Sequence, residues 1–386
     1  MMRKTINFLK LRYPHFFRMI FNLRDFILIE IPSRLNILRI RKVGSTDIAV
    51  LYLTAKFPAR PTTRREHAHG GAVKLTYLAE TFPHAFPSAN LIYAVTSIGH
   101  PLQDDVLLRA KRSGFKLVVN HDGVAFPAWA GDKYIEFNQI TKRILDQADF
   151  IVYQSRFSEL SAGLYLTPPN VPYEVVYNPV DTLYFVPQPD MKKPKELTLL
   201  LGGNQYEKYR LELALKTLRA LLVHVPNARL IVTGKLWLPY RESEEWTARA
   251  LKEMDLTDHV TFTGTYTQVD APRVYSQAHL LIHTKYADPC PGLIPEALGC
   301  GLPVVYVGNG GVPELVQDAG IGVPVEHSWE TINLPAPTEM AGAVMQVYSR
   351  LNDYSQAARQ QAQKFSLENF VARHKDIFTK VLDLKR

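Results

Sequence analysis

The sequence predicts an α/β protein made of two doubly wound parallel sheets that face a cleft. Short apolar runs alternate with helical patterns along most of the chain, which is typical of parallel sheets covered by helices. The alternation stops at a proline-rich, charged stretch at 186–196, which we interpret as a linker, and then restarts. The length of 386 residues favours two hydrophobic cores over one.

These patterns define three parts of the chain. We expect an extension at 1–45, a first domain at 46–180 and a second at 181–365, with a helix at 366–386 joining the first domain. Apolar residues make up 46% of the chain and charged residues 21%, as in ordinary soluble proteins. Two cysteines, Cys290 and Cys300, provide neither a disulfide framework nor metal-ligand spacing, which favours a reducing, cytoplasmic compartment.

Residues 1–45 form a basic amphipathic extension. They hold ten Lys and Arg against two acids, so the net charge of +8 belongs to this segment. No uncharged run approaches the roughly 18–20 residues that span a bilayer, and no signal-peptide pattern is present. Two interpretations stay open: an interfacial helix on the anionic inner face of the cell membrane, or a helix packed on the protein. No basic patch with interleaved aromatic residues lies in the rest of the chain, so we expect no nucleic-acid partner.

The first domain is predicted from five strands and the loops that follow them. The expected strands are 48–53, 91–95, 115–119, 150–153 and 175–177. Gly70 and Gly71 open a helix after the first strand, where glycines let the backbone approach a phosphate. The flanking His67 and His69 are interpreted as loop residues, since no partner has metal-ligand spacing. The third strand ends in the segment from Asn120 to Gly123, at the expected edge of the cleft.

The second domain repeats the alternation. Its expected strands are 197–201, 229–233, 260–263, 280–283 and 304–307, with helices at 208–223 and 241–253 and a helical tail from 337. Within it, Asp288 and Glu296 flank a proline-rich turn, and a glycine loop, 308–311, follows the last strand. Acids, glycines and helix N-termini would meet at one edge of a parallel sheet, where such folds bind ligands. Helix N-termini suit a diphosphate and a carboxylate suits a ribose diol, although two surface acids would give the same pattern.

The sequence around Asp288 and Glu296 resembles that of a known protein family. The stretch D-P-C-P-G-x-x-P-E-A-L-G-C-G-L-P-V-V, followed by G-G-V-P-E-L-V, resembles the retaining glycosyltransferases of family four (glycosyl transferases group 1). The segments ADFIVYQS, YNPVD and YEK extend the resemblance over roughly 46–380. It implies the GT-B fold of two Rossmann-like domains. Three positions depart from the family pattern: Asp288 for glutamate, Gly292 for an asparagine found in one branch, and Gly203 for arginine.

The resemblance assigns roles to residues of the second domain. Glu296 is implied to bind the ribose of a donor nucleotide, and Asp288 to lie near the transferred sugar as a catalytic residue. The backbone of Gly292, Leu293 and Ile294 is implied to hold the sugar or diphosphate. Lys208 matches the lysine that neutralises the leaving diphosphate, and Asn204 and Arg210 complete the donor-binding set. Arg210 is expected to substitute for the arginine missing at 203.

In the first domain, the resemblance implies donor contacts for Gly70 and Gly71 and a catalytic hydrogen bond from His121 to the donor sugar. Asp122 is expected to be structural or to face the acceptor, and Asn178 and Asp181 to join the domains. Further candidates for the acceptor side are Arg156, Phe126, Trp129 and Tyr134.

The resemblance predicts a retaining, metal-independent glycosyltransferase without a cofactor. It would move a sugar from a nucleotide-diphosphate donor to a glycan or lipid-linked acceptor in envelope or exopolysaccharide synthesis. Positioning and electrostatic stabilisation would supply most of the catalysis. Two alternatives stay open: a GT-B nucleotide-sugar epimerase, and a non-catalytic partner subunit, which Gly203 suggests. A nicotinamide dehydrogenase is disfavoured because no G-x-G-x-x-G follows the first strand.

Overall fold

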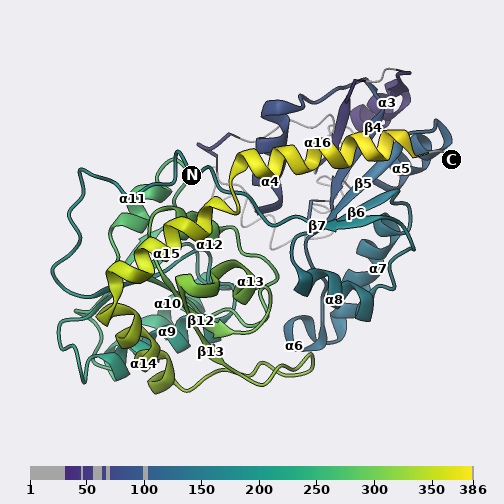
Figure 1. Cartoon of the computed structure of the whole chain (residues 1–386). Helices are drawn as coiled ribbons and strands as arrows, with labels where there is room; N and C mark the ends of the chain where they lie inside the picture. Colours follow the sequence, from purple (N-terminus) through teal and green to yellow (C-terminus); the bar gives the residue numbers. More distant parts are fainter. Residues whose placement is uncertain (1–30, 45–46, 55–62, 67–69, 99–102, 385–386) are drawn as a thin grey trace, which may run out of the picture.

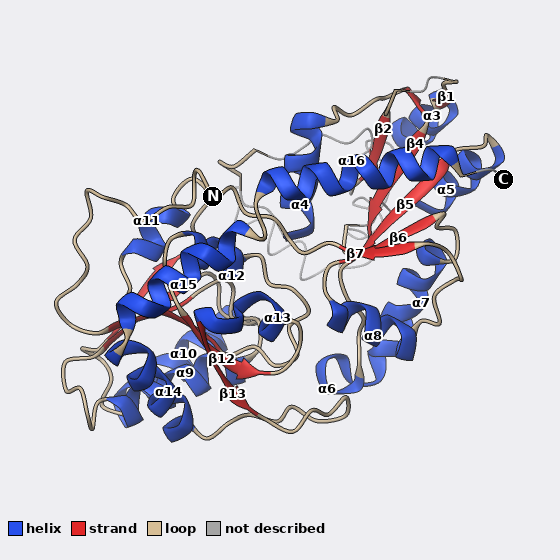
Figure 2. Ribbon diagram, in the orientation of Figure 1, coloured by secondary structure: helices blue, strands red, loops and turns tan. Residues whose placement is uncertain are grey.

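A computed structural model describes residues 31–44, 47–54, 63–66, 70–98 and 103–384 (Figure 1). His67, His69 and residues 1–30 of the basic extension lie outside the described residues. The rest forms two α/β units, each with its own parallel sheet, as the sequence predicts (Figure 2).

The first domain contains a five-stranded parallel sheet in the order β2-β4-β5-β6-β7. Its strands are β2 (Val50–Leu53), β4 (Leu91–Val95), β5 (Lys116–His121), β6 (Phe150–Tyr153) and β7 (Tyr173–Val175). The continuous apolar character of β2, β4 and β6 follows from burial on both faces. A short parallel pair, β1 (Arg41–Lys42) and β3 (Ser88–Ala89), lies outside this sheet and was not predicted.

Helices cover both faces of this sheet. One core contains apolar side chains of α4 (Gly70–Thr81) and α16 (Leu367–Asp383), and the other contains those of α5 (Gln103–Arg112), α7 (Tyr134–Leu145) and α8 (Arg156–Tyr165). The remaining helical segments are α3 (Ile31–Arg39), α6 (Pro127–Ala130) and η2 (Gly131–Lys133). The last helix therefore returns from the second domain to complete the first (Figure 1).

The second domain contains a six-stranded parallel sheet in the order β10-β9-β8-β11-β12-β13. Its strands are β8 (Thr198–Leu201), β9 (Arg229–Thr233), β10 (Val260–Gly264), β11 (Leu280–His283), β12 (Val304–Gly308) and β13 (Gly320–Pro324). The sequence predicted all but β13, because the glycines and proline of that segment resemble a turn. As an edge strand, β13 tolerates this composition.

The helices of the second domain are distributed over two cores. They are α9 (Lys208–Leu221), α10 (Tyr240–Glu253), α11 (Ala271–Ser276), α12 (Leu293–Gly299), α13 (Val312–Val316), η3 (Gln317–Ala319), α14 (Pro337–Ser349) and α15 (Leu351–Gln363). Leucines of α9 pack with α14 on one face, and α12, α13 and α15 cover the other.

The prediction of an inter-domain linker at 186–196 is wrong. Val176 belongs to a core of the first domain and Val180 to a core of the second, so the chain crosses within a few residues. Residues 186–196 then lie on the second domain, where the Gln188 N–H donates to Ser276 Oγ (3.3 Å) and Lys193 Nζ to the Ala278 carbonyl (2.5 Å). Prolines and charges here mark a surface loop of one domain. The returning chain pairs with the crossing at the bridge between Val180 and Ser366.

Candidate functional site

The carboxyl ends of β5 and β11 bring two predicted segments together across the domain junction. Gly123 has φ +140°, and a Cβ built on it would lie 3.2 Å from Pro289 Cγ. Asn178 Nδ2, on the crossing segment, donates to the Cys290 carbonyl (2.5 Å). The segments that contain His121 and Asp288 are therefore in contact, although they come from different domains.

Asp288 lies in the loop between β11 and α12, with 7% of its surface exposed. Its Oδ2 is 3.3 Å from Lys285 Nζ and 3.3 Å from His283 Nε2. Burial disfavours the charged carboxylate, but Lys285, His283 and Arg210 outweigh it and hold the pKa of Asp288 well below its usual range. Asp288 is therefore ionised at neutral pH and surrounded by cationic and imidazole groups.

Glu296 lies in the first turn of α12, as predicted, in contrasting surroundings. Its two oxygens accept hydrogen bonds from Tyr275 Oη (2.8 Å) and Gln268 Nε2 (3.1 Å). Burial raises the pKa of Glu296 above its usual value, and these two hydrogen bonds only partly oppose that shift. Gln268 Nε2 also lies 3.5 Å from Tyr77 Oη on α4, so this acid is linked to the first domain.

The glycine loop after β12 packs directly on the Asp288 segment. Gly310 has φ +75°, and a Cβ built on it would lie 2.7 Å from the Asp288 carbonyl oxygen. Asn309 Oδ1 accepts from the Ala287 N–H (2.9 Å) and the Gly311 N–H donates to the Asp288 carbonyl (2.9 Å). The glycines of this loop therefore shape the backbone that presents Asp288.

Gly292 is the N-cap of α12, and Leu293 begins the helix. The Ile294 N–H already donates to the Pro291 carbonyl (3.1 Å), so in this conformation it is occupied within the chain. Of the three predicted backbone contacts, those of Gly292 and Leu293 remain the better candidates.

Gly203 stands where the resemblance expects arginine, and its backbone explains the difference. It has φ +76°, a left-handed conformation that glycine adopts without strain. A Cβ at this position would lie 3.3 Å from Leu293 Cδ2, so the turn after β8 packs against the start of α12. The side chain of the adjacent Asn204 accepts from the Lys235 N–H (2.8 Å) and donates to Tyr206 Oη (2.8 Å), which fixes the turn.

The side chains of Lys208 and Arg210 lie in different surroundings. Lys208 Nζ lies 4.7 Å from the ring centroid of Trp246, in a cation–π contact on an exposed side chain. Arg210 is only 5% exposed, donates to the Asn204 carbonyl (2.6 Å) and lies 3.6 Å from Glu207 Oε2. Arg210 is close enough to lower the pKa of Asp288 and belongs to its surroundings, whereas Lys208 rests on α10.

In the first domain, Gly71 packs on Ser97: a Cβ on it would lie 2.8 Å from Ser97 Oγ, while Gly70 is open. His121 is fully enclosed, and its ring meets Tyr153 edge-on at 5.7 Å between centroids. Neither ring nitrogen has a hydrogen-bond partner among the described residues. Burial lowers the pKa of His121 to about 4, so the ring is neutral at pH 7.

Lys74 is a buried residue of the junction that the sequence reasoning missed. It lies on α4 with 1% exposure, and its Nζ donates to Asn120 Oδ1 (2.7 Å) and Gln154 Oε1 (3.3 Å). The pKa of Lys74 is lowered by burial, against the charge of Asp122 at 3.9 Å. The available signal was its place on the apolar face of its helix, three residues before Tyr77 and four before Leu78. His283 and Lys285 were also missed, because their role depends on how the chain folds back after β11.

Two further contacts hold the domains together. Glu314 of α13 accepts from the backbone N–H groups of Arg156 (2.8 Å) and Phe157 (2.9 Å), and so caps α8 of the first domain. Trp329 stacks on Phe157 (5.3 Å between centroids) and meets Phe126 edge-on (5.3 Å). Phe126, predicted to line the acceptor side, is thus part of an inter-domain aromatic cluster.

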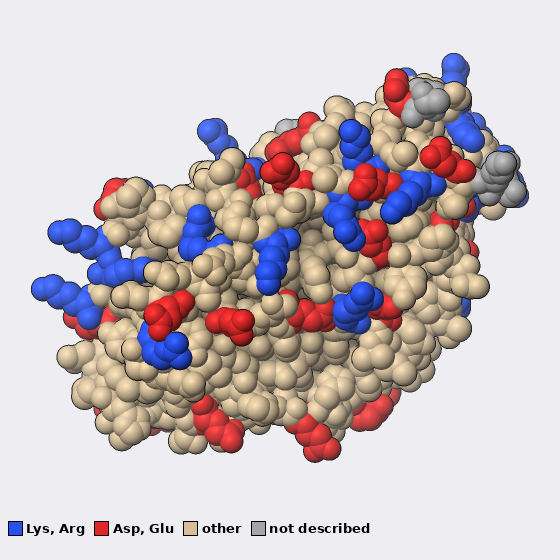
Figure 3. All heavy atoms as spheres, viewed as in Figure 1, with Lys and Arg blue, Asp and Glu red and all other residues tan. Residues whose placement is uncertain are grey.

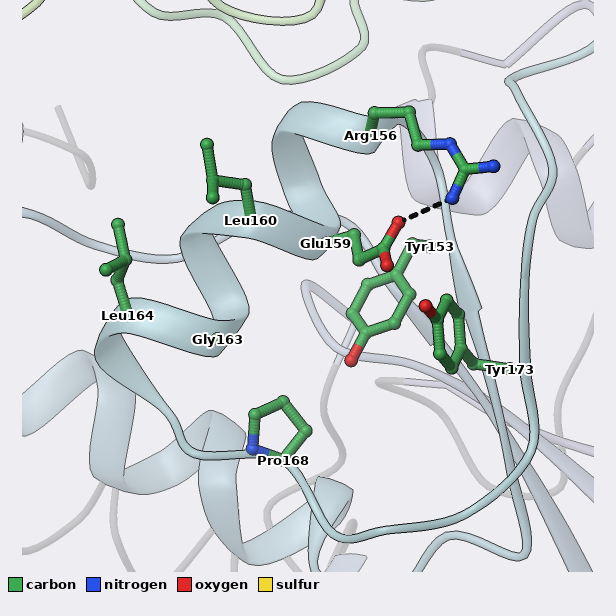
Figure 4. A pocket seen from close by; sticks show the side chains of 8 residues that line it. All are labelled: Tyr153, Arg156, Glu159, Leu160, Gly163, Leu164, Pro168 and Tyr173. Carbon is green, nitrogen blue, oxygen red and sulfur yellow. Dashed lines mark hydrogen bonds and ion pairs between the residues drawn. The ribbon is translucent and has the colours of Figure 1, made fainter.

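The other acceptor-side candidates lie around α7 and α8. Tyr134 packs edge-on to Tyr165 (5.8 Å between centroids), and Trp129 is 50% exposed. Arg156 forms an ion pair with Glu159 (2.9 Å) at one end of a hollow of about 590 Å³ between α8 and β7 (Figure 4). Leu160, Leu164 and Tyr173 give this hollow an apolar lining.

On the face in Figure 3, acidic and basic side chains are interspersed. Within the described ranges, no three His, Cys, Asp or Glu side chains gather as metal ligands would, and none of the helices there has the length and apolar character to cross a membrane.

Comparison with known proteins relates the second domain to a described family. The family model of glycosyl transferases group 1 matches residues 187–334, which include both acids. The chain is 27% identical over 205 residues to a GDP-mannose-dependent α-(1-6)-phosphatidylinositol monomannoside mannosyltransferase of Mycolicibacterium smegmatis, covering 48% of this chain and 51% of the relative. It is 29% identical over 149 residues to a D-inositol 3-phosphate glycosyltransferase of Mycobacterium marinum, covering 38% and 31%. The matched part thus spans about half or less of these relatives' length.

Solved structures share the whole architecture. HepE of Anabaena in complex with UDP superposes with a TM-score of 0.65 at 15% identity, covering 86% of this chain and all of that one. Sucrose-phosphate synthase of Thermosynechococcus elongatus gives a TM-score of 0.62 at 17% identity, covering 80% and 77%. The two Rossmann-like domains of this chain therefore adopt the GT-B fold, and its second domain carries the match to glycosyl transferases group 1.

Proposed function

We propose that the protein is a retaining, metal-independent glycosyltransferase of family four. It would transfer a hexose from a nucleotide-diphosphate donor to a glycan or lipid-linked acceptor in envelope or exopolysaccharide synthesis. The observation that carries the proposal is Asp288, an ionised and almost fully buried carboxylate at the domain junction. It lies within the segment that matches glycosyl transferases group 1, where a donor bound by the second domain would meet an acceptor bound by the first.

The donor is proposed to lie along the carboxyl edge of the second sheet. Glu296 would accept hydrogen bonds from the ribose diol, and the turn at Gly292 and Leu293 would hold the diphosphate or sugar. Lys208 would have to leave Trp246 to reach the diphosphate, so we propose that Arg210 and Lys285 supply the resident positive charge. These cations would stabilise the negative charge that develops on the leaving group without a metal ion.

The reaction is proposed to retain configuration because the leaving diphosphate assists removal of the acceptor proton on the same face. Asp288 would orient the sugar and stabilise positive charge at the reacting carbon. His121 would contact the donor sugar only after the turn at 122–124 moves, since its ring is enclosed. The enzyme would act mainly through positioning and fixed charge.

The donor base and sugar are proposed from the named neighbours. HepE has been solved with UDP-glucose, and the mycolicibacterial relative depends on GDP-mannose, so UDP-glucose and GDP-mannose are the first donors to test. The basic extension at 1–45 is proposed as a peripheral contact with the anionic inner face of the membrane, which would bring the protein to a lipid-linked acceptor. Ile37 and Ile40 are buried in the core of the first domain, so the deletion should stop before them. Liposome flotation should show binding that is lost when residues 1–30 are deleted.

The test is a thermal-shift screen in EDTA with UDP, GDP, UDP-glucose and GDP-mannose, followed by assays of nucleotide release. A ligand that binds only the folded state raises Tm, so at least one nucleotide should do so. The matching donor should then release nucleoside diphosphate, and NMR of the product should show the anomeric configuration of the donor. If none of the four ligands changes Tm, the nucleotide-donor proposal is wrong.

The same experiment separates the two alternatives. An epimerase would convert the nucleotide sugar without forming a glycoside. A non-catalytic partner subunit would give neither turnover nor protection by nucleoside diphosphate. Gly203 by itself does not favour the second alternative, because the turn there requires the left-handed backbone that glycine provides.

A further inference from the structure

The side chain of Lys74 is buried inside the first domain, and its ammonium group lies at the end that faces the domain junction. Its Nζ reaches Asn120 at the end of β5 and Gln154 just after β6, and it lies 3.9 Å from the Asp122 carboxylate. Removing an ammonium group from water is costly, and an apolar side chain of similar length would fill the space without that cost. Lys74 is therefore hard to explain as a packing residue alone.

The oxygen atoms around Lys74 continue into a chain of hydrogen bonds that crosses the domain junction. Gln154 Oε1 accepts from Lys74 Nζ and also from Asn178 Nδ2 (3.2 Å). The same Asn178 nitrogen donates to the carbonyl of Cys290, two residues after Asp288. Gln154 and Asn178 are 4% and 5% exposed, so water does not compete freely for these bonds.

A second branch fixes the turn that touches Pro289. Asp122 accepts from Thr96 Oγ1 (2.5 Å), from the Ser97 N–H (3.1 Å) and from the Ser97 hydroxyl. Gln154 Nε2 donates to the Asp122 carbonyl. Lys74 thus holds both the Asp122–Gly123 turn, on the first-domain side, and, through Gln154 and Asn178, the Asp288 loop on the other.

We propose that Lys74 is a positioning residue that couples the two domains and sets the placement of Asp288 against the first domain. Its role in turnover rests on the proposed glycosyltransferase function; its role in coupling the domains does not. Lys74 acts through Gln154, Asn178 and Asp122 and touches no donor. Nucleotide binding by the second domain should therefore survive its loss, whereas sugar transfer across the junction should not.

The test compares K74M with K111M. Methionine keeps the length and removes the charge. Lys111 is the matched control, because it also bonds an acid of the first domain, Asp149 (2.7 Å), but that bond lies beside Leu117, at the opposite end of β5. For K74M we expect the Kd for UDP or GDP to change by less than about threefold. Turnover of UDP-glucose or GDP-mannose should fall by about 10–100-fold, while K111M retains near wild-type turnover.

A second arm measures the coupling without any donor. We would measure the Tm of K74M, of N178A and of the double variant. Together with the wild type, these form a double-mutant cycle that reports the coupling between Lys74 and Asn178. We expect the double variant to lose less Tm than the two single losses added together, by at least about 2 °C. Additive losses would overturn the domain-coupling role, and wild-type turnover in K74M would overturn the positioning role. If the wild type binds no nucleotide, the glycosyltransferase proposal fails, and the cycle still decides the coupling.

Discussion

Asp288 and Glu296 are eight residues apart on one loop and helix, yet their surroundings act on them in opposite directions. Lys285, His283 and Arg210 hold the pKa of Asp288 low, whereas burial raises that of Glu296, whose partners are the neutral Tyr275 and Gln268. Pairs of acids whose environments separate their pKa values often have separate chemical roles. The difference teaches that spacing alone does not define this pair; the charges around each acid do.

The largest effect should come from Asp288→Asn. It removes the charge that we propose to face the reacting sugar, and it leaves Lys285 without its anionic partner. We expect turnover to fall by about 10²–10³-fold, with Kd for nucleoside diphosphate within a few-fold of wild type. Asp318→Asn, at an exposed position of η3, is the control and should behave as wild type. Wild-type turnover in Asp288→Asn would mean that this acid has no role in the chemistry.

Glu296→Gln should act mainly on binding. A hydrogen bond to a charged group contributes about 1.5–3 kcal/mol, so loss of the carboxylate should weaken UDP or GDP by roughly 10–100-fold. Isothermal titration calorimetry measures this directly. Tyr275→Phe removes one partner of the carboxylate while leaving its charge, and should weaken binding less. Equal affinity of Glu296→Gln and wild type would assign the ribose to another group.

The two acids should also differ in their response to pH. As pH falls below neutral, Glu296 is protonated before Asp288, because the pKa of Glu296 is raised and that of Asp288 is lowered. Wild-type nucleotide affinity should therefore fall more than that of Glu296→Gln. For stability the signs are opposite. The stabilisation from Asp288 is present above the ordinary aspartate pKa and is lost as pH falls toward its depressed value. Glu296 destabilises the fold at neutral pH, and that cost disappears on protonation. Parallel affinity profiles for wild type and Glu296→Gln would contradict this order.

The smallest effect should come from Gly203→Arg, which adds the family's arginine beside the helix that carries Glu296. The left-handed backbone costs a non-glycine residue about 1–2 kcal/mol, so Tm should fall by about 2–6 °C. Gly203→Ala shares this cost without the charge. Affinity for UDP should rise by less than about threefold relative to Gly203→Ala, since Arg210 and Lys285 already provide cations near Asp288. A larger gain would show that the diphosphate site lacks a cation.

Much of this architecture could be predicted because it depends on local pattern. Four of the strands, β4, β6, β9 and β11, match the predicted bounds. In β4, β6 and β11 every residue of the strand is buried, which makes the pattern continuous. The position of Glu296 in the first turn of α12 followed from the proline before it. The resemblance predicted the GT-B fold and assigned roles to the two acids, and the match over 187–334 includes both acids.

The missed features depend on contacts between distant parts of the chain. Lys74 donates to Gln154, and Asn178 donates to the same Gln154 oxygen, only after three elements pack together. Trp329 contacts Phe157 and Phe126 only across the domains. For Lys208, the sequence predicted the lysine at the start of a helix correctly. The direction of its side chain, toward Trp246 on α10, could not be predicted because it depends on how α9 and α10 pack. A one-dimensional pattern indicates which residue occurs, and packing determines what it faces.

The cap that Glu314 places on α8 has a consequence for building hybrid enzymes. The first four N–H groups of α8 are all bonded, those of Arg156 and Phe157 by Glu314 and those of Ser158 and Glu159 by Ser155. Half of this cap therefore belongs to the other domain. A chimera that exchanges one half of this chain for that of another GT-B protein would have to transplant the glutamate together with the helix it completes. Otherwise two amides at the start of α8 would lose their carboxylate partner.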